Sequence, residues 1–137
     1  MSIVRIVASA VVLGVVALAA EAQEPERMPD PPYTPALRTC LEKPENQGTM
    51  GMVDCMGAET QIWDRRLNRE YQATLRSLES ETQARLRAAQ RLWVQFRDAN
   101  CLTYRTLTGG SMDALSAADC MMRMTALRAL ELERMRQ

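Results

Sequence analysis

The stretch Ala89-Gln90-Arg91-Leu92-Trp93-Val94-Gln95-Phe96-Arg97-Asp98-Ala99-Asn100-Cys101 holds one of the two tryptophans, the only phenylalanine and one of the four cysteines. Its pattern predicts an α-helix rather than a strand, because apolar residues recur at steps of three and four, at Leu86, Ala89, Trp93 and Phe96. Gln90, Arg97 and Cys101 lie one residue along from this stripe, so we expect them at the rim of a buried surface. The stretch predicts a helix that is fixed within a structural scaffold, and it contains no residue pattern that indicates a reaction.

The first 22 residues have the three parts of a secretory signal peptide. Arg5 supplies the positive charge, residues 6–20 form an apolar run, and Ala20-Glu21-Ala22 has the small residues of a cleavage site. This run is shorter than the roughly 20 residues that span a bilayer. We therefore expect cleavage near Ala22, a mature chain in the periplasm or outside the cell, and no stable membrane insertion.

The composition limits what the mature chain binds and how it is held together. The sequence has 17 basic and 17 acidic residues and no histidine, so its net charge at pH 7 is zero. A neutral chain gives no electrostatic case for nucleic acid as a partner. Signal removal leaves about 115 residues, enough for one small domain. In an exported protein, four cysteines are expected to pair as disulfides.

The prolines mark the boundary of the folded domain. All six lie between Pro25 and Pro44. We expect residues 23–39 to be an extended tether, residues 41–51 to be a loop or short turn, and the helical domain to occupy 40–137. The rest of the chain has no proline and is rich in Ala, Leu, Met, Arg and Glu, which favours helix.

Three long helices are expected, from about 52 to 78, 81 to 107 and 112 to 135. Ser80 and Gln83 have the spacing of a capping box at the start of the second helix. Gly109-Gly110-Ser111 would end it, because glycine adopts the left-handed conformation of a helix C-terminus. Expected inner positions of the first and third helices are Met56, Trp63, Leu67, Tyr71, Leu75, Leu78, Leu115, Met122, Ala126, Ala129 and Leu130.

A turn near Ser80 would bring polar residues of the first two helices to the same height. Residues equally distant from the turn lie level on an antiparallel pair, which predicts an ion pair between Asp64 and Arg97. The same turn makes Asn68 level with Trp93 and Tyr71 level with Gln90. The predicted polar cluster is therefore Asp64, Asn68, Tyr71, Gln90, Trp93 and Arg97. We interpret it as a structural cluster that sets the register of the helices, with a recognition patch as the alternative.

A second turn near Gly110 would make residues of the second and third helices level in the same way. It places Cys101 level with Cys120, and a disulfide requires Cα atoms within roughly 7 Å of each other. Cys40 is then left to pair with Cys55. A bridge between Cys55 and Cys101 is disfavoured by an axial offset of about 7.5 Å, but it stays open as an alternative.

Metal and catalytic sites are weakly indicated. The methionines at 50, 52, 56, 121, 122 and 124 would allow Cu(I) binding in an oxidising compartment, so a periplasmic copper-binding protein is one alternative. Without histidine, and with the methionines spread over several helix faces, adaptable core filler is the preferred interpretation. No zinc spacing, phosphate loop or nucleophile elbow is present. We expect no metal, no cofactor and no catalytic residue.

The ordered set of motifs resembles the LprI-type lysozyme-inhibitor family of exported bacterial proteins. The resemblance covers about Cys40 to Leu132 and lies in Cys55, Asp64-x-x-Leu67-Asn68-x-x-Tyr71, Leu86-x-x-Ala89-Gln90-x-x-Trp93-x-x-Phe96-Arg97-Asp98-x-x-Cys101, Gly109-Gly110-Ser111, Cys120 and Arg128. It implies a small disulfide-containing helical domain of the periplasm or cell exterior, and binding and inhibition of lysozyme.

Taken together, these observations predict an all-α protein with three main antiparallel helices in an up-down-up array, held by two disulfides. The expected function is non-catalytic protein binding outside the cytoplasm, with lysozyme as the named partner. Two alternatives remain: an envelope adaptor or stress-response module that does not bind lysozyme, and a Cu(I)-binding protein.

Overall fold

The computed structural model describes residues 30–136, and this part of the chain is all-helical. A short helix α1 (Pro35–Leu41) and a 3-10 turn η1 (Pro44–Asn46) precede three long helices, α2 (Thr49–Ser77), α3 (Ser80–Tyr104) and α4 (Met112–Arg134). The predicted all-α fold with three main helices and two disulfides is confirmed. The predicted signal peptide, residues 1–22, lies outside the described residues.

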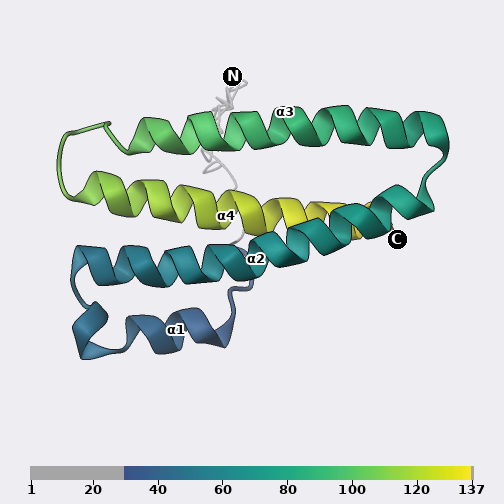
Figure 1. Ribbon diagram of the computed structural model, residues 1–137. Coiled ribbons are helices and arrows are strands. Elements are labelled where there is room, and N and C mark those ends of the chain that lie inside the picture. Colours follow the sequence, from purple (N-terminus) through teal and green to yellow (C-terminus); the bar gives the residue numbers. More distant parts are fainter. Residues whose placement is uncertain (1–29, 137) are drawn as a thin grey trace, which may run out of the picture.

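The last helix occupies the middle of the array. α2 and α4 run in the same direction and α3 runs in the opposite direction, with α4 between the other two (Figure 1). α4 packs along α2, and α3 packs on α4. α2 and α3 share core contacts near the turn that joins them, where Leu75 and Leu86 belong to one cluster. The up-down-up course therefore places α2 and α3 apart over most of their length.

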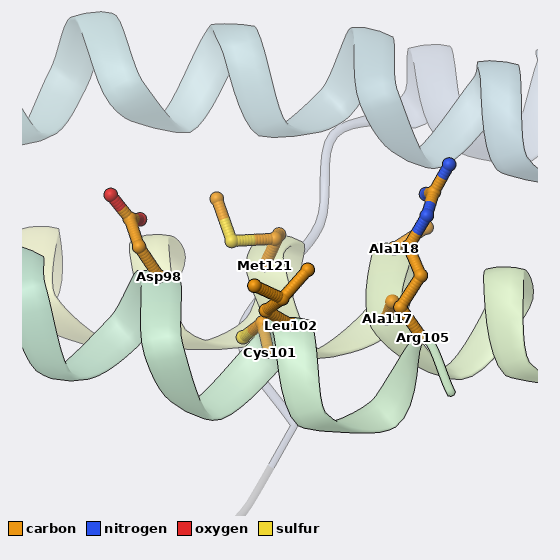
Figure 2. A pocket seen from close by; sticks show the side chains of 7 residues that line it. All are labelled: Asp98, Cys101, Leu102, Arg105, Ala117, Ala118 and Met121. Atoms are coloured by element: carbon orange, nitrogen blue, oxygen red, sulfur yellow. The ribbon is translucent and has the colours of Figure 1, made fainter. Parts of the chain in front are cut away.

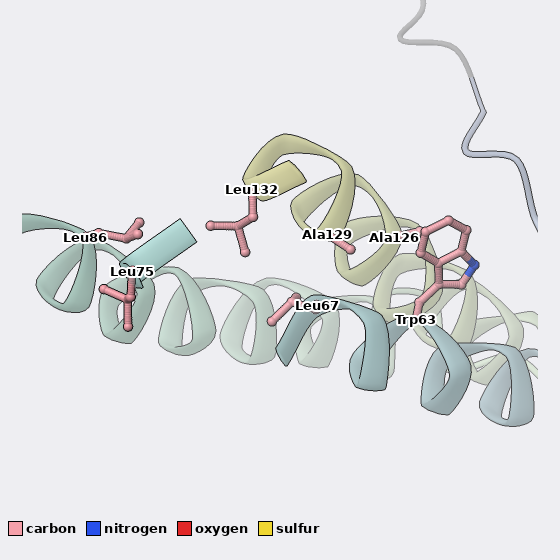
Figure 3. Close-up of a cluster of buried hydrophobic side chains, with 7 residues drawn as sticks. All are labelled: Trp63, Leu67, Leu75, Leu86, Ala126, Ala129 and Leu132. Carbon is pink, nitrogen blue, oxygen red and sulfur yellow. The ribbon is translucent and has the colours of Figure 1, made fainter. Parts of the chain in front are cut away.

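Small side chains allow α2 and α4 to approach closely. Ala126 and Ala129 of α4 are completely buried and belong to the same cluster as Trp63 and Leu67 of α2 (Figure 3). The separation of packed helices depends on the side chains at the contact, and alanine permits a short one. The larger side chains fill the space on either side, and burying each contributes about 1.5–3 kcal/mol. This cluster is the main core of the molecule.

A buried carboxylate attaches the residues before α1 to α2. Glu59 is 1% exposed and accepts hydrogen bonds from the backbone N–H of Thr34 at 2.7 Å, the hydroxyl of Thr34 at 2.5 Å and the indole N–H of Trp63 at 2.8 Å. A buried charge is tolerated when several donors surround it. Glu59 therefore ties the N-terminal segment to the main core.

Residues 35–39, which were expected to be extended, form most of α1. Pro35 stands in the first turn, where its missing N–H leaves no hydrogen bond unmade. Leu37 is buried against Cys55 and Met122, and the disulfide between Cys40 and Cys55 fastens the end of α1 to α2. The tether prediction was wrong here because proline at a helix start favours the helix rather than ending it.

The predicted capping box at the start of α3 is not formed. Glu79, rather than Ser80, occupies the N-cap position, and no side chain caps it. Gln83 donates its side-chain amide to the carbonyl of Leu78 at 2.9 Å. Gln83 therefore satisfies the end of α2 instead of the start of α3.

The predicted inner stripe of α3 is displaced around the helix. Phe96 is 61% exposed and Ala89 is exposed, whereas Leu86, Gln90 and Cys101 are buried. The side of α3 that contacts α4 therefore combines Leu86 and Trp93 with the polar Gln90 and with Cys101. Two apolar residues of the predicted stripe are left facing solvent.

The Ala129→Leu substitution is expected to destabilise the domain by about 1–3 kcal/mol, because the added carbons enter a filled space between α2 and α4. The matched control is Ala58→Leu on the exposed side of α2, which should change stability by less than about 0.5 kcal/mol. Urea unfolding of both variants measures the difference. Equal effects would contradict the close packing of α4 on α2.

Candidate functional site

Of the polar cluster predicted across α2 and α3, the α3 members Gln90, Trp93 and Arg97 lie against α4 instead. Arg97 donates to the hydroxyl of Thr125 at 3.2 Å, and Arg128 donates to the side-chain carbonyl of Gln90 at 3.0 Å. Both guanidinium groups lie over the ring of Trp93, at 5.2 and 5.8 Å from its centre. Cation–π contacts of this kind add to the hydrogen bonds. Gln90, Trp93 and Arg97 thus hold α3 on α4.

The predicted ion pair between Asp64 and Arg97 is not present among the described residues. Arg97 pairs with its neighbour Asp98 at 2.8 Å, while Asp64 accepts a hydrogen bond from Asn68 at 3.2 Å along α2. The reason is that α4 lies between the two helices at this height. Near the turn between α2 and α3, the residues expected to be level do lie close together, since Tyr71 and Gln90 line the same hollow.

Arg128 belongs to this cluster, although the predicted polar cluster did not include it. It is 7% exposed, and it also pairs with Glu131 at 2.7 Å. Its neighbours in sequence include the buried Ala126 and Ala129. An arginine within an apolar helix stripe requires an internal partner, because burying an unpaired charge is costly. That signal was available in the sequence.

The end of the α3–α4 pair, residues 101–120, forms a separate unit, which we call the hairpin end. The disulfide between Cys101 and Cys120 closes it with a Cα–Cα distance of 5.5 Å, and the predicted pairing of Cys40 with Cys55 is confirmed as well. The thioether sulfur of Met124 lies 3.7 and 3.8 Å from the sulfurs of Cys101 and Cys120. The bridge is therefore packed on one side by Met124.

One aspartate organises the loop of the hairpin end. Asp113 is 5% exposed and accepts three hydrogen bonds, from the backbone N–H and hydroxyl of Thr108 and from the backbone N–H of Gly109. Gly109 has a φ of 75°, a left-handed conformation that favours glycine. The hydrogen bonds from Thr108 and Gly109 hold the pKa of Asp113 below its usual value.

Large apolar side chains are exposed on this ordered loop and its flanks. Leu102 is 65% exposed, Leu107 is 62% exposed and Met112 is 57% exposed, and Tyr104 is also exposed. Such side chains lose free energy by remaining in water. Their grouping on one stapled end of the molecule is typical of a contact surface.

Two hollows lie beside the disulfide. The smaller has a volume of about 240 Å³ and is lined by Leu102, Met121 and two alanines, with the charged groups of Asp98 and Arg105 on opposite sides (Figure 2). The larger, of about 640 Å³, is lined by residues of three helices that include Met56, Leu107, Asp119 and Arg123. The hairpin end therefore offers apolar hollows with charged rims.

Burial changes the acidity of two groups near the larger hollow. Desolvation raises the pKa of Asp119 above its ordinary value. It also raises the pKa of Tyr33 to about 12, with the nearby carboxylates of Asp119 and Glu59 adding to the effect. The hydroxyl of Tyr33 is buried and has no hydrogen-bond partner within residues 30–136.

Neither metal ligands nor membrane helices stand out in the described part of the chain. It contains no group of three or more His, Cys, Asp or Glu residues that could hold a metal ion. Met121 lines the smaller hollow, Met56 and Met124 line the larger one, and Met122 is buried. No helix within residues 30–136 combines the length and apolarity of a bilayer crossing.

Comparison with known proteins places this architecture in a family. The family model described as lysozyme inhibitor LprI matches residues 40–132, which include all four cysteines, α2, α3 and all but the last two residues of α4. The chain belongs to the lysozyme inhibitor LprI family. The predicted family membership is therefore confirmed.

A solved structure shares the fold of this LprI family member. It is the crystal structure of an uncharacterised protein from Burkholderia thailandensis, with a TM-score of 0.64 and 25% sequence identity. The match covers 74% of this chain but only 51% of the other, so the chain spans about half the length of that protein. No curated protein matches the chain.

Two double-mutant cycles test the reassigned polar cluster. Gln90→Ala combined with Arg128→Ala should show a coupling free energy of at least about 1 kcal/mol, because the pair is a buried hydrogen bond to a charged group. Asp64→Ala combined with Arg97→Ala should be additive to within about 0.5 kcal/mol. Chemical unfolding supplies both values. A coupling free energy between Asp64 and Arg97 in the second cycle would show that the ion pair predicted from the sequence does form.

The Asp113→Asn variant is expected to lose stability at neutral pH and to lose the acid sensitivity of the hairpin end. The lowered pKa of Asp113 means that ionised Asp113 stabilises the fold above pH 4, and that this stabilisation is lost as the pH falls through the lowered value. Thermal melting from pH 7 to pH 2 should therefore show the two proteins converging in acid. A constant difference in melting temperature would contradict the role of the carboxylate.

Proposed function

We propose that this LprI family member is exported and acts outside the cytoplasm by binding a protein, without catalysing a reaction, and that its partner is lysozyme. Family membership supports the choice of partner. Two disulfides and no free cysteine among residues 30–136 support an oxidising compartment. The signal peptide expected at residues 1–22 would direct the chain there.

The observation that carries this proposal is the exposure of Leu102, Leu107 and Met112 on a rigid hairpin end. Protein interfaces are centred on a few large side chains that enter pockets of the partner. A loop that is already ordered loses little conformational entropy on binding. The disulfide and the hydrogen bonds to Asp113 supply that order before a partner arrives.

The hollows beside the disulfide would allow each of the two proteins to insert apolar side chains into the other. A partner's apolar side chain would enter the smaller hollow between Leu102 and Met121, with Asp98 and Arg105 available to its polar neighbours. The apolar residues of the loop would enter the partner at the same time. We infer that binding at the hairpin end blocks the access of substrate to lysozyme and leaves the fold of lysozyme unchanged.

The test is the clearing of a peptidoglycan suspension by lysozyme in the presence of excess disulfide-bonded protein. We expect the protein to slow clearing, and Leu107→Ser to raise the concentration needed for half inhibition about tenfold or more, as for an interface anchor. The matched control is Met135→Ser, which alters an exposed methionine (47%) at the opposite end of α4 (Figure 1). Melting curves of the variants show whether each is folded.

Two results would contradict the proposal. Undiminished clearing with excess wild-type protein would exclude inhibition of that lysozyme and favour an adaptor that binds another envelope protein. Inhibition that Leu107→Ser leaves unchanged would move the contact away from the hairpin end.

A further inference from the structure

The larger hollow of the hairpin end is lined by an aspartate that the fold leaves without a partner. Asp119 is half-buried, and its carboxylate makes no hydrogen bond or ion pair within residues 30–136. The buried carboxylates of Glu59 and Asp113, by contrast, each accept three hydrogen bonds. Taking a carboxylate out of water costs free energy unless donors surround it. Asp119 is therefore able to accept hydrogen bonds from a donor outside the chain.

The arginine closest to Asp119 along α4 does not neutralise it. Arg123 lines the same hollow four residues further on, a spacing at which an aspartate and an arginine commonly pair. Its guanidinium bonds to Asp30 instead. Burial raises the pKa of Asp119, and the negative charge of Asp119 in turn helps to raise the pKa of Tyr33. Asp119 therefore presents an uncompensated negative charge to the hollow.

The other polar groups that line the hollow can also accept hydrogen bonds. Asn100 directs its side-chain N–H groups to two sulfur atoms, at 3.4 and 3.6 Å, while its side-chain carbonyl oxygen makes no hydrogen bond within the described part of the chain. Tyr104 and Ser116 line the hollow as well, and their hydroxyls have no hydrogen-bond partner among residues 30–136. An occupant with a positive charge and several N–H donors would complement this set.

The walls of the hollow are apolar and come from α2, α4 and the loop between α3 and α4. They include Met56, Leu107, Leu115 and Leu127, and the volume of about 640 Å³ lies in the range of pockets that hold small ligands. A bare cation would leave these walls in contact with water. Arginine and lysine side chains instead lay an aliphatic stem along apolar surface while their charged end reaches a polar group. The walls therefore favour a basic side chain over a free ion.

We propose that the larger hollow receives an arginine side chain of the protein that binds the hairpin end, and that Asp119 pairs with its guanidinium group. Arginine matches the hollow better than lysine does, because its planar guanidinium offers five N–H donors and can bond a carboxylate through two of them. The ring of Tyr104 offers a cation–π contact in the same hollow. The inference rests on the protein-binding function proposed above, and it names the chemical group of the partner that this end of the molecule recognises.

A small probe tests the hollow without lysozyme. N-acetyl-arginine amide is titrated into the isotopically labelled, disulfide-bonded protein to about 20 mM, because a single side chain is expected to bind with a Kd in the millimolar range. We expect saturable shifts of the NMR signals of the Asn100 and Asp119 amides. N-acetyl-citrulline amide, which has nearly the same shape but no charge, is the matched probe and should bind at least about tenfold more weakly.

The Asp119→Asn variant keeps the size of the side chain and removes its charge, so its affinity for the arginine probe should fall about tenfold. The matched control is Asp54→Asn, which makes the same change of charge at an exposed position of α2 outside the hollow. It should bind the probe as wild type does, and melting curves show whether each variant is folded. Equal binding of the arginine and citrulline probes, or unchanged affinity of Asp119→Asn, would overturn the proposal.

The same variants in the clearing assay connect the hollow to the protein partner. Asp119→Asn should raise the concentration needed for half inhibition of lysozyme about tenfold, whereas Asp54→Asn should leave it unchanged. Inhibition that Asp119→Asn leaves unchanged would overturn the assignment of the hollow to this contact. If wild type does not slow clearing, the proposed inhibition of lysozyme fails, and binding of the arginine probe would then support the hollow as the arginine site for another protein.

Discussion

The packing of α4 directly against α2 is the constraint on which the rest of the structure depends. Two completely buried alanines, Ala126 and Ala129, let the helices approach, and Trp63, Leu67 and Leu132 fill the space around them. Because α4 occupies this position, α3 packs on α4 and is kept apart from most of α2. The edge position of α3 and its exposed apolar flank both follow from that arrangement.

Different parts of the molecule therefore stabilise the fold and offer a surface for binding. The main core and the Glu59 network hold α2, α4 and the N-terminal segment together. The hairpin end depends on its own disulfide and on Asp113, so it remains ordered with little core beneath it. Exposed leucine and methionine side chains on such an end cost stability, and binding a protein partner would offset that cost. This division suits the proposed role, in which a fixed surface is presented to a protein partner.

Sequence reasoning succeeded where the signal was local. Apolar periodicity placed the three long helices, and the glycines at 109 and 110 placed the turn that brings Cys101 to Cys120. It failed where a third element decided the outcome. The level comparison of Asp64 with Arg97 assumed that consecutive helices pack side by side, but α4 lies between them. The stripe through Phe96 was assigned to the core because periodicity identifies an apolar face without saying what covers it.

Hydrogen exchange of backbone amides, measured by NMR, tests the central position of α4 most directly. The account predicts that amides of α2 and α4 around Leu67 and Ala129 exchange slowest, through unfolding of the whole domain. Amides of α3 between Arg91 and Ala99 should exchange faster, through a local opening that leaves α2 and α4 packed. Equal protection of all three helices would contradict the account, and so would greater protection of α3 than of α4.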